Sequence, residues 1–290
     1  MKAIHYIIIT PVRNEEQYIQ RTLSCVCNQT VLPIEWIIIN DGSTDRTGLI
    51  LNEYSGKYGF ITIVDRDDRG YRKAGGGVIE AFYEGYKRIK HGEWDFLVKL
   101  DGDLSFDTDY FERCFDEFNK DPRLGIGGGD IYHKLADDSI ALEKQPRFHV
   151  RGATKIYKKE CWDAIGGLIK APGWDTIDEV KANMLGWSTH NFSNLRLFHH
   201  RHTGAADGGW KNSIKNGMAN YISGYHPLFM IVKCIKRMPS KPIVLSSIGL
   251  LWGFISGYLK KAERIGDDEL IKYLRKQQLN LLLGKRTIWV

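Results

Sequence analysis

The chain has 290 residues, of which 43% are hydrophobic and 26% are charged. This composition excludes a disordered chain and supplies enough apolar material for one large domain, or for one domain with an extension. The formal charge of +6 is uneven, because residues 201–261 hold nine Lys or Arg and one acid while the rest has a slight excess of acids. We expect an anionic partner for the basic stretch, either a membrane surface or a nucleic acid.

The cysteines and the N-terminus indicate the compartment. The five cysteines, at positions 25, 27, 114, 161 and 234, form no CxxC pair, so we expect reduced thiols and no zinc site. The apolar run near the N-terminus is too short for a signal peptide, and acidic residues follow it at once. Both observations predict a cytoplasmic protein.

Strand-like and helix-like segments alternate over the first hundred residues. Strands are predicted at 5–10, 35–40, 60–65 and 95–100, and helices at 15–28, 44–58 and 74–90. The strands are short and almost wholly apolar, as is typical of a parallel sheet with both faces covered by helices. We therefore predict an α/β fold, in which ligands bind at the carboxyl ends of the strands.

A polar cluster follows each predicted strand. The clusters are TPVRNE (10–15), NDGSTD (40–45), DRDDRGYRKAGG (65–76) and DGD (101–103). NDGSTD alone fits a tight turn followed by helix-capping residues, which leaves Asp41 without a structural role. DGD alone also fits a turn, but Asp101 and Asp103 are hard oxygen ligands that suit Mg²⁺ or Mn²⁺, which substrate phosphates typically complete. Their shared edge of the sheet favours a phosphate-bearing ligand.

Residues 107–200 show a looser pattern. A helix is predicted at 107–119, strands near 125–132 and 153–158, a short helix at 177–186 and a strand at 188–198. This part is expected to complete the sheet and to receive a second substrate. Within WDTIDEVKANMLGW (174–187), Thr176 and Glu179 form a predicted capping box. Asp178 is then either an acid favoured by the helix dipole or a general base held in a first turn that opens onto the site.

The order of these motifs carries more information than any one of them. TPVRNE, NDGSTD, RKAGG, DGD and TIDE, followed by a short helix that ends in GW, closely resemble the family 2 glycosyltransferases over roughly residues 5–200. The resemblance implies a GT-A fold, a Rossmann-like mixed sheet flanked by helices. We expect a glycosyltransferase domain at 1–205, with a nucleotide-binding half at 1–105 and an acceptor half at 106–205. A basic helical region, 206–290, extends it.

The resemblance also implies roles for single residues in donor binding. Asp41 matches the aspartate that reads the uracil base, and Asp103 matches the acid that carries Mn²⁺ or Mg²⁺ on the diphosphate. The nucleotide-binding residues implied in this way are Thr10, Pro11, Glu15, Asp41, Lys73 and Asp101.

Catalysis is implied for the segment TIDE. Asp178 matches the family's catalytic base, although Ile177 replaces the middle acid of the TED pattern and leaves Glu179 as the alternative. In FHHRHTG (198–204), His199 and Arg201 belong either to a lid over the diphosphate or to an ordinary surface turn. Because the spacing of the three histidines in this segment fits no standard zinc site, we do not expect these histidines to bind metal.

The segment IVLSSIGLLWGFISGYL (243–259) has no charge over 17 residues. It is at the short limit for a bilayer span, its glycines and serines weaken that interpretation, and lysines flank both of its ends. We place first an interfacial segment with Trp252 and Tyr258 near the headgroups, second a core helix hairpin, and third a span.

Together these observations predict an inverting, metal-dependent transferase that moves one sugar from a nucleotide-sugar, foremost a UDP-sugar, to a hydroxyl acceptor. The acceptor is a carbohydrate or a lipid-linked sugar in cell-surface polysaccharide or glycolipid assembly, at the inner face of the membrane, with no nucleic acid as partner. The alternatives are a sugar nucleotidyltransferase, for which TPVRNE lacks the expected glycine-rich loop, and a non-catalytic membrane- or nucleic-acid-binding scaffold.

Overall fold

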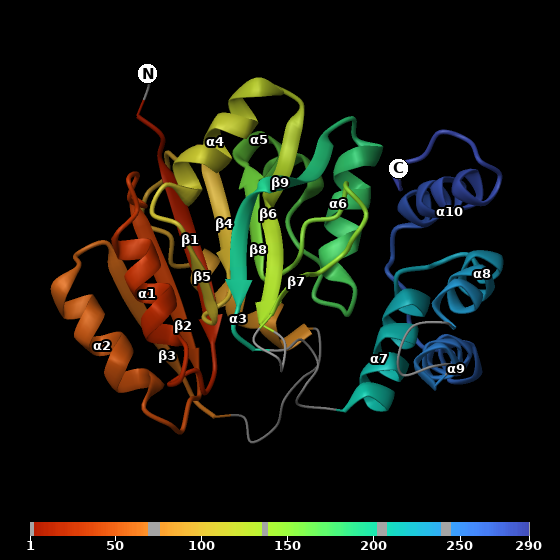
Figure 1. The fold of residues 1–290 in the computed structure, drawn as a ribbon, viewed down its shortest axis with the longest axis horizontal. Helices are drawn as coiled ribbons and strands as arrows, with labels where there is room; N and C mark the ends of the chain where they lie inside the picture. Colours follow the sequence, from red (N-terminus) through yellow and green to blue (C-terminus); the bar gives the residue numbers. More distant parts are fainter. Residues whose placement is uncertain (1–2, 69–75, 135–138, 202–207, 239–244, 290) are drawn as a thin grey trace.

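The structure is a computed structural model that describes residues 3–68, 76–134, 139–201, 208–238 and 245–289. Within these residues nine strands form one sheet, in the order β3-β2-β1-β4-β8-β6-β9-β5, with β7 paired to β6 (Figure 1). Helices cover both faces of the sheet, and four further helices lie at one end of the molecule. The predicted boundary at 205/206 falls outside the described residues.

The first half of the sheet is parallel, as predicted. Its strands are β1 (Tyr6–Val12), β2 (Glu35–Asp41), β3 (Ile61–Arg66) and β4 (Phe96–Leu100), connected by helices α1 (Ile19–Cys27), α2 (Thr47–Lys57) and α3 (Gly76–Tyr86). Successive side chains of a strand point to opposite faces, and both faces are buried here. Tyr6 and Ile8 therefore enter one hydrophobic cluster while Ile7 and Ile9 enter another, so the run Tyr6–Ile9 of β1 is apolar without a break.

The second half makes the sheet mixed. Its strands are β5 (Leu104–Phe106), β6 (Leu124–Lys134), β7 (Ile140–Leu142), β8 (Thr154–Lys158) and β9 (Ser188–His199), with helices α4 (Tyr110–Lys120), α5 (Lys159–Ile165) and α6 (Trp174–Met184). Strand β8 runs antiparallel to both β4 and β6, whereas β9 runs parallel to β6. The short elements β5, β7 and α5 are not predicted from the sequence.

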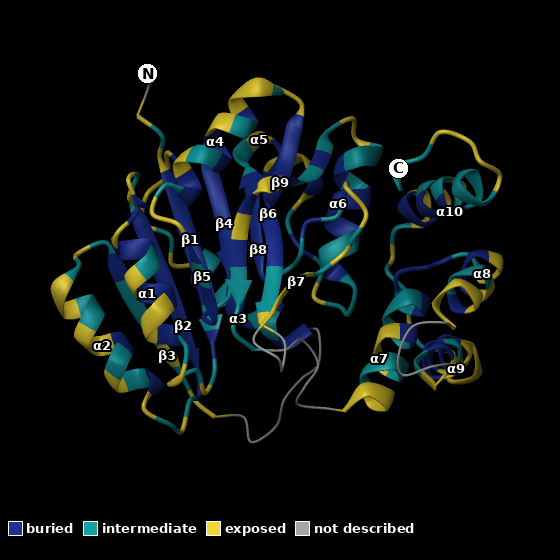
Figure 2. Cartoon of the chain, in the orientation of Figure 1, coloured by how far each residue is buried: buried dark blue, intermediate teal, exposed yellow. Residues whose placement is uncertain are grey.

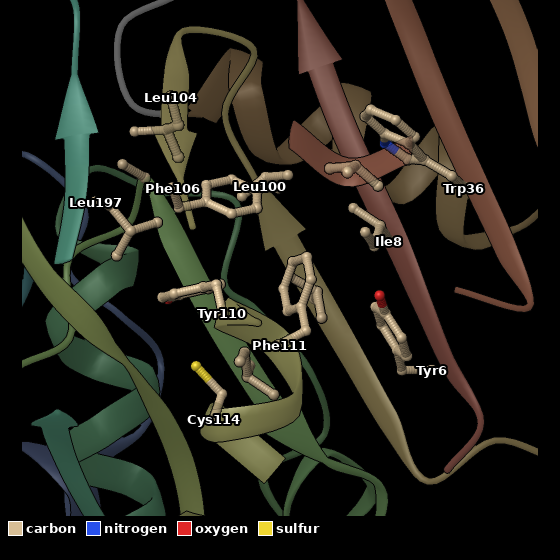
Figure 3. Packing of buried hydrophobic residues seen from close by; sticks show 14 of the residues in the cluster. Tyr6, Ile8, Trp36, Leu100, Leu104, Phe106, Tyr110, Phe111, Cys114 and Leu197 are labelled. Atoms are coloured by element: carbon tan, nitrogen blue, oxygen red, sulfur yellow. The ribbon is translucent and has the colours of Figure 1, made fainter. Parts of the chain in front are cut away.

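Two hydrophobic clusters hold the sheet between its helices. Helices α1, α2 and α4 contribute to one cluster, in which aromatic rings pack closely and the Tyr6 and Phe111 centroids lie 5.1 Å apart (Figure 3). Helices α3, α5 and α6 contribute to the other. Strands β1, β2 and β4 are accordingly almost entirely buried, whereas β3, β7 and β9 are partly exposed (Figure 2). The buried central strands give the loops at their carboxyl ends a rigid base.

The basic C-terminal region is helical, as predicted. Its helices are α7 (Gly209–Ile222), α8 (Pro227–Arg237), α9 (Leu245–Leu259) and α10 (Asp268–Leu282). They share a third cluster with α6, which contributes Ile177 and Val180. Helices α7 and α9 cross closely, because a Cβ added to Gly253 would lie 2.0 Å from the Ile214 carbonyl oxygen. Of the helices that the structure describes, none has the length and apolarity needed to cross a membrane.

Candidate active site

The loops after β1 and β2 lie together at the carboxyl edge of the parallel strands. Asp41 ends β2, and its carboxylate lies 2.8 Å from Nη1 of Arg66 at the end of β3. Asn14 takes the left-handed conformation, with φ of 54°, and its side chain accepts a hydrogen bond from the backbone of Thr44 at 2.8 Å. The two loops therefore support each other beside Asp41.

The remaining predicted nucleotide residues differ in position. The Thr10 hydroxyl is buried and accepts a 2.9 Å hydrogen bond from the Trp36 indole, so it ties β1 to β2. Pro11 is partly exposed on the same strand. Glu15 accepts a 2.5 Å hydrogen bond from Arg201, which draws the segment after β9 onto the loop after β1. Lys73 lies outside the described residues.

Asp101, Asp103 and His199 form a cluster suited to a metal ion. Their ligand atoms all lie within 4.8 Å of one another, and His199 Nε2 is 3.2 Å from Asp103 Oδ2. The pairing of β5 with β9 causes this contact, because Leu104 lies opposite His199 in the antiparallel register. The sequence expectation that these histidines take no part in metal binding does not match this geometry. Their spacing could not reveal a ligand set shared with a distant strand.

The donor set fits a divalent cation. Asp103 is buried, and its Oδ1 has no hydrogen-bond partner among the residues that the structure describes. A buried carboxylate oxygen without a partner is costly unless a ligand completes it. Carboxylate oxygens suit Mg²⁺ and Mn²⁺, and an added imidazole is compatible with first-row transition metals. Asp101, Asp103 and His199 are therefore the residues that would hold the ion.

The charged groups of this cluster shift one another's pKa values. Burial raises the pKa of Asp101, and the negative charge of Asp103 adds to that effect while Lys99 opposes it. Burial also acts to raise the pKa of Asp103, but His199 and Arg201 outweigh it and leave the pKa lowered. Burial acts to lower the pKa of His199, yet the two carboxylates outweigh it and raise that pKa. A cation would relieve the repulsion between the two acids.

Lys99 connects the metal cluster to helix α6. Its ammonium group donates to the Asp101 carboxylate and, at 2.5 Å, to the Gly152 carbonyl oxygen. The Trp174 ring, in the first turn of α6, lies 5.6 Å from Lys99 Nζ. A Cβ added to Gly152 would lie 2.8 Å from that ring, so glycine permits the close packing. The beginning of α6 is thereby fixed next to the end of β4.

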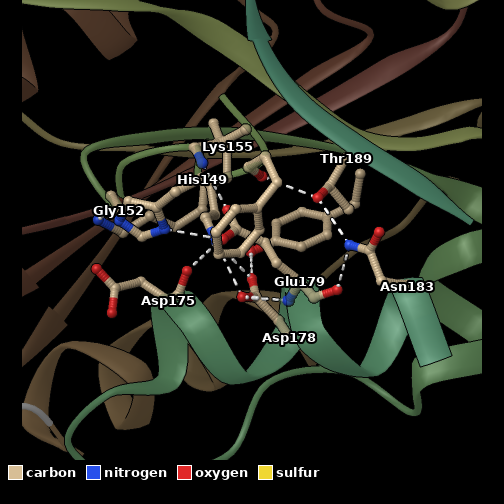
Figure 4. A network of polar contacts seen from close by, with 12 residues as sticks. His149, Gly152, Lys155, Asp175, Asp178, Glu179, Asn183 and Thr189 are labelled. Carbon is tan, nitrogen blue, oxygen red and sulfur yellow. Dashed lines mark hydrogen bonds and ion pairs between the residues drawn. The ribbon is translucent and has the colours of Figure 1, made fainter. Parts of the chain in front are cut away.

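Asp178 and Glu179 belong to a buried polar network (Figure 4). Both Asp178 carboxylate oxygens lie 2.8 Å from Lys155 Nζ, and Tyr157 donates to Oδ2 at 2.6 Å. Glu179 accepts from the Val150 backbone at 2.6 Å and pairs with Lys155 at 2.9 Å. Burial, together with the charge of Glu179, raises the pKa of Asp178 to about 6 against the opposing effect of Lys155.

The predicted capping box is wrong. Helix α6 begins at Trp174, its N-cap is Gly173 with φ of 87°, and no side chain caps it. Asp178 therefore lies in the second turn, where it is only 3% exposed, and not in a first turn that opens onto the site. Glu179 uses its carboxylate in the buried network instead of returning to the backbone of Thr176.

Asp175 is the carboxylate that occupies the first turn of α6, and sequence reasoning missed its place there. It is half-buried, and in Figure 4 its carboxylate points away from Lys155, whereas Asp178 points toward that lysine. Burial acts to raise the pKa of Asp175, but His149, Lys155 and Arg151 outweigh it and lower the pKa. The misplaced helix start, three residues too late, hid this assignment.

The mixed sheet with helices on both faces matches the GT-A type of glycosyltransferase fold. Residues 7–170 match the family described as "Glycosyl transferase family 2", and the chain belongs to this family. The predicted family and fold are thus confirmed.

Several curated relatives match part of the chain. Chondroitin synthase of Pasteurella multocida (strain Pm70) is 33% identical over 117 residues, which are 40% of this chain and 11% of that protein. The poly-beta-1,6-N-acetyl-D-glucosamine synthase of Staphylococcus epidermidis is 34% identical over 117 residues, which are 40% of this chain and 26% of that protein. The matches thus span a minor part of the relatives' length.

Solved structures resemble the fold over almost the whole chain. The mannosyltransferase PcManGT from Pyrobaculum calidifontis, in complex with GDP-Man and Mn²⁺, superposes with a TM-score of 0.56 at 15% identity, covering 96% of this chain and 80% of that one. TarS 1-349 of S. aureus, in complex with UDP, gives a TM-score of 0.54 at 13% identity, covering 97% and 86%. At these identities the likeness shows the fold.

Proposed function

We propose that this protein transfers a sugar from a nucleotide-sugar to a hydroxyl acceptor with the help of a divalent cation. The observation that carries the proposal is the cluster of Asp101, Asp103 and His199 at the carboxyl edge of the parallel strands. Asp103 Oδ1 is buried and has no partner within the described part of the chain, which gives the cluster a coordination position to fill. Support also comes from the two solved neighbours, which bind GDP-Man with Mn²⁺ and UDP.

The residues around the cluster suit a leaving nucleoside diphosphate. When bound, the cation supplies Lewis-acid stabilisation of the negative charge that develops on the diphosphate. Arg201 places its Nε 4.0 Å from Asp103 and adds positive charge on the same side. Asp41, at the end of β2, is held by its ion pair with Arg66 and is assigned to binding the nucleotide base. Our first choice for that base is uracil, with UDP as the leaving group.

The proton acceptor is assigned to the start of α6. Asp178 was expected from the sequence, but its oxygens already bind Lys155 and Tyr157 below the surface. Asp175 is more accessible, and its lowered pKa keeps it ionised near neutral pH. We therefore infer that Asp175 takes the proton of the attacking hydroxyl in a single inverting displacement, while Asp178 and Lys155 hold the first turns of α6 in place.

Two substitutions separate these assignments. Asp175→Asn is expected to lower kcat by about 10²–10⁴-fold, the usual contribution of a general base, with unchanged UDP affinity and unchanged thermal unfolding. Asp178→Asn is expected to lower the unfolding temperature, because the buried network loses a charge opposite Lys155. If Asp178→Asn abolishes transfer in a stably folded protein while Asp175→Asn stays active, Asp178 is the base.

The acceptor and the cellular location are inferred from the proposed reaction and from the named relatives. We infer a carbohydrate or lipid-linked acceptor in cell-surface polysaccharide or glycolipid assembly, at the cytoplasmic face of the membrane. The relatives named as chondroitin and poly-N-acetylglucosamine synthases support polysaccharide assembly. The loop after β1 bears no glycine, which disfavours a sugar nucleotidyltransferase.

A thermal-shift panel of UDP-, GDP- and dTDP-sugars, each with and without Mn²⁺, tests the donor and the metal together. We expect one nucleotide class to raise the unfolding temperature, and only in the presence of Mn²⁺. Asp103→Asn should abolish that rise and lower the transfer rate by about 10²–10³-fold, since it weakens the electrostatic stabilisation of the leaving group. Asp116→Asn, an exposed acid on α4, is the matched control. A panel without any response would refute the proposal.

A further inference from the structure

We propose that the outer faces of α8 and α9 form a docking surface for an anionic lipid bilayer. The surface, called here the apolar docking face, combines two stripes of exposed large hydrophobic side chains. They are Leu228, Ile231, Ile235 and Met238 at α8, and Leu245, Ile248, Trp252, Ile255 and Leu259 of α9. This inference goes beyond sugar transfer and does not depend on it.

Helix α9 is apolar on two opposite sides for two different reasons. Its glycines, at 249, 253 and 257, recur every four residues and face α7, where a side chain would clash with the neighbouring helix. Ile248, Trp252 and Ile255 recur at helical spacing on the other side, and Trp252 is 52% exposed. The side of α9 that carries the glycines packs against α7. The side that carries Trp252 is not covered by any part of the protein that the structure describes.

Helix α8 repeats this division. Phe229, Met230 and Cys234 are buried in the same hydrophobic cluster as Leu250 and Phe254 of α9. Because both helices direct their buried sides into one cluster, their exposed sides face outward. Figure 2 shows exposed residues on both helices, at the end of the molecule away from β1–β3. Stripes of this size on two adjacent helices are unusual for a surface that stays in water.

Charge identifies the partner. Residues 208–262 contain no Asp or Glu, although acids make up 35 of the 290 residues. Lys236 and Arg237 end α8, and Lys260 and Lys261 follow α9 directly. Basic residues that border an exposed apolar stripe are typical of interfacial helices on anionic membranes, and Trp and Tyr favour the headgroup level. Trp252 supplies such an aromatic side chain, whereas the Tyr258 ring packs against Tyr221 on the side that faces α7.

A second copy of the chain fits this face less well. Self-association through it would bring the two basic borders together, and like charges across an interface are unfavourable. A lipid bilayer instead offers both an apolar phase for the stripes and anionic headgroups for the lysines. Helix α9 has 15 residues, about 22 Å at 1.5 Å per residue, which suits a helix lying in the interface.

The position of the face suits the proposed acceptor. Helix α7, against which α9 packs, begins at the edge of the molecule toward which β1, β2 and β3 point (Figure 1). If the proposed transferase function holds, docking would bring a membrane-anchored hydroxyl to the same edge as the metal cluster. Docking itself can be measured without any transfer reaction.

Co-sedimentation of the full chain with lipid vesicles tests the proposal. We expect binding to phosphatidylcholine vesicles that contain phosphatidylglycerol, weak binding to pure phosphatidylcholine, and release as salt is raised. Trp252→Glu should lower the partition coefficient at least about tenfold, because it removes an aromatic anchor and adds a repelled charge. Lys236→Gln with Arg237→Gln should lower it about fivefold for each charge removed.

Leu49→Glu on α2 is the matched control, because Leu49 is 70% exposed and lies in the other half of the molecule. This variant should bind vesicles like the parent, and all variants should keep the parent's thermal unfolding. Absence of binding to anionic vesicles at low salt would overturn the proposal, as would equal losses from Leu49→Glu and Trp252→Glu. A parent dimer that Trp252→Glu converts to a monomer, without vesicle binding, would assign the face to a second copy. A parent protein that binds anionic vesicles but transfers no sugar would count against the proposed transferase function and not against the docking surface.

Discussion

The molecule contains two pairs of neighbouring acids that look alike in the sequence and differ in the structure. Asp101 and Asp103 follow β4, and Asp178 and Glu179 lie in α6. Each pair has its own buried lysine, and the two lysines, Lys99 and Lys155, lie directly opposite each other in the β4–β8 register. Both ammonium groups are 5.6 Å from the ring of Trp174. Two ammonium groups directly across a strand pair repel each other, so each needs a neighbouring carboxylate. The first acid pair neutralises Lys99, and the second neutralises Lys155.

The pairs differ in how far their oxygens are satisfied. Every carboxylate oxygen of Asp178 and Glu179 has a partner, from Lys155, Tyr157, His149 or the backbone. Asp103, in contrast, keeps one buried oxygen without a partner among the described residues. A saturated pair can stabilise structure but has little capacity left for a ligand. A buried carboxylate oxygen without a hydrogen-bond partner therefore distinguishes the pair that suits a ligand, Asp101 and Asp103, from the structural pair in α6. The sequence pattern of the two pairs does not make this distinction.

Lys155→Met should give the largest change in stability. It leaves two buried carboxylates without their cation, and removal of one partner from a buried ion pair typically costs about 3–5 kcal/mol. Urea denaturation should therefore show a lower free energy of unfolding, and Mn²⁺ should not restore it. Lys57→Met, which removes an exposed partner of Glu53, should leave the unfolding curve nearly unchanged. A stable Lys155→Met protein would refute the structural role of this pair.

Lys99→Met should have a smaller effect that Mn²⁺ reverses. Asp101 is partly exposed and loses one charged partner, so we expect a loss of about 1–3 kcal/mol in EDTA. A cation bound by Asp101, Asp103 and His199 would replace the missing positive charge and stabilise the folded state in proportion to its occupancy. Urea denaturation with EDTA and with Mn²⁺ measures both parts. Equal responses of the Lys99 and Lys155 variants to Mn²⁺ would erase the distinction between the two pairs.

Local patterns predicted the parallel half of the fold. The four apolar strands and the helices between them were located within a few residues, because burial on both faces imposes a continuous apolar run. The edge at which the polar loops gather follows from parallel topology alone. Asp101 and Asp103 were therefore placed correctly as a cluster at the end of β4.

Contacts between distant segments were beyond local patterns. His199 reaches Asp103 only because the three-residue strand β5 pairs with the end of β9, and so short a strand carries little periodicity. The start of α6 was misjudged because Thr176 and Glu179 imitate a capping box, while the helix begins after Gly173. Lys155, which decides how Asp178 behaves, lies on another strand, and nothing in its own sequence neighbourhood indicates the pairing.

The pH dependence of metal binding gives the smallest expected effect. The carboxylates of Asp103 and Asp101 raise the pKa of His199, so its protonated form stabilises the metal-free protein at low pH, and this stability is lost as pH rises through the raised pKa. A cation needs the neutral imidazole, so binding releases a proton. Mn²⁺ affinity measured by calorimetry should increase between pH 6 and 8, by up to about tenfold per pH unit below the His199 pKa.

His199→Gln should flatten this dependence because it removes the titrating ligand. His190→Gln is the control, since burial lowers the pKa of His190 and the residue lies outside the metal cluster. Calorimetry in two buffers of different ionisation enthalpy would count the released proton directly. The same pH slope in the parent and in His199→Gln would remove His199 from the ligand set. The protein ligands of the cation would then be Asp101 and Asp103 alone, and the diphosphate would complete its coordination.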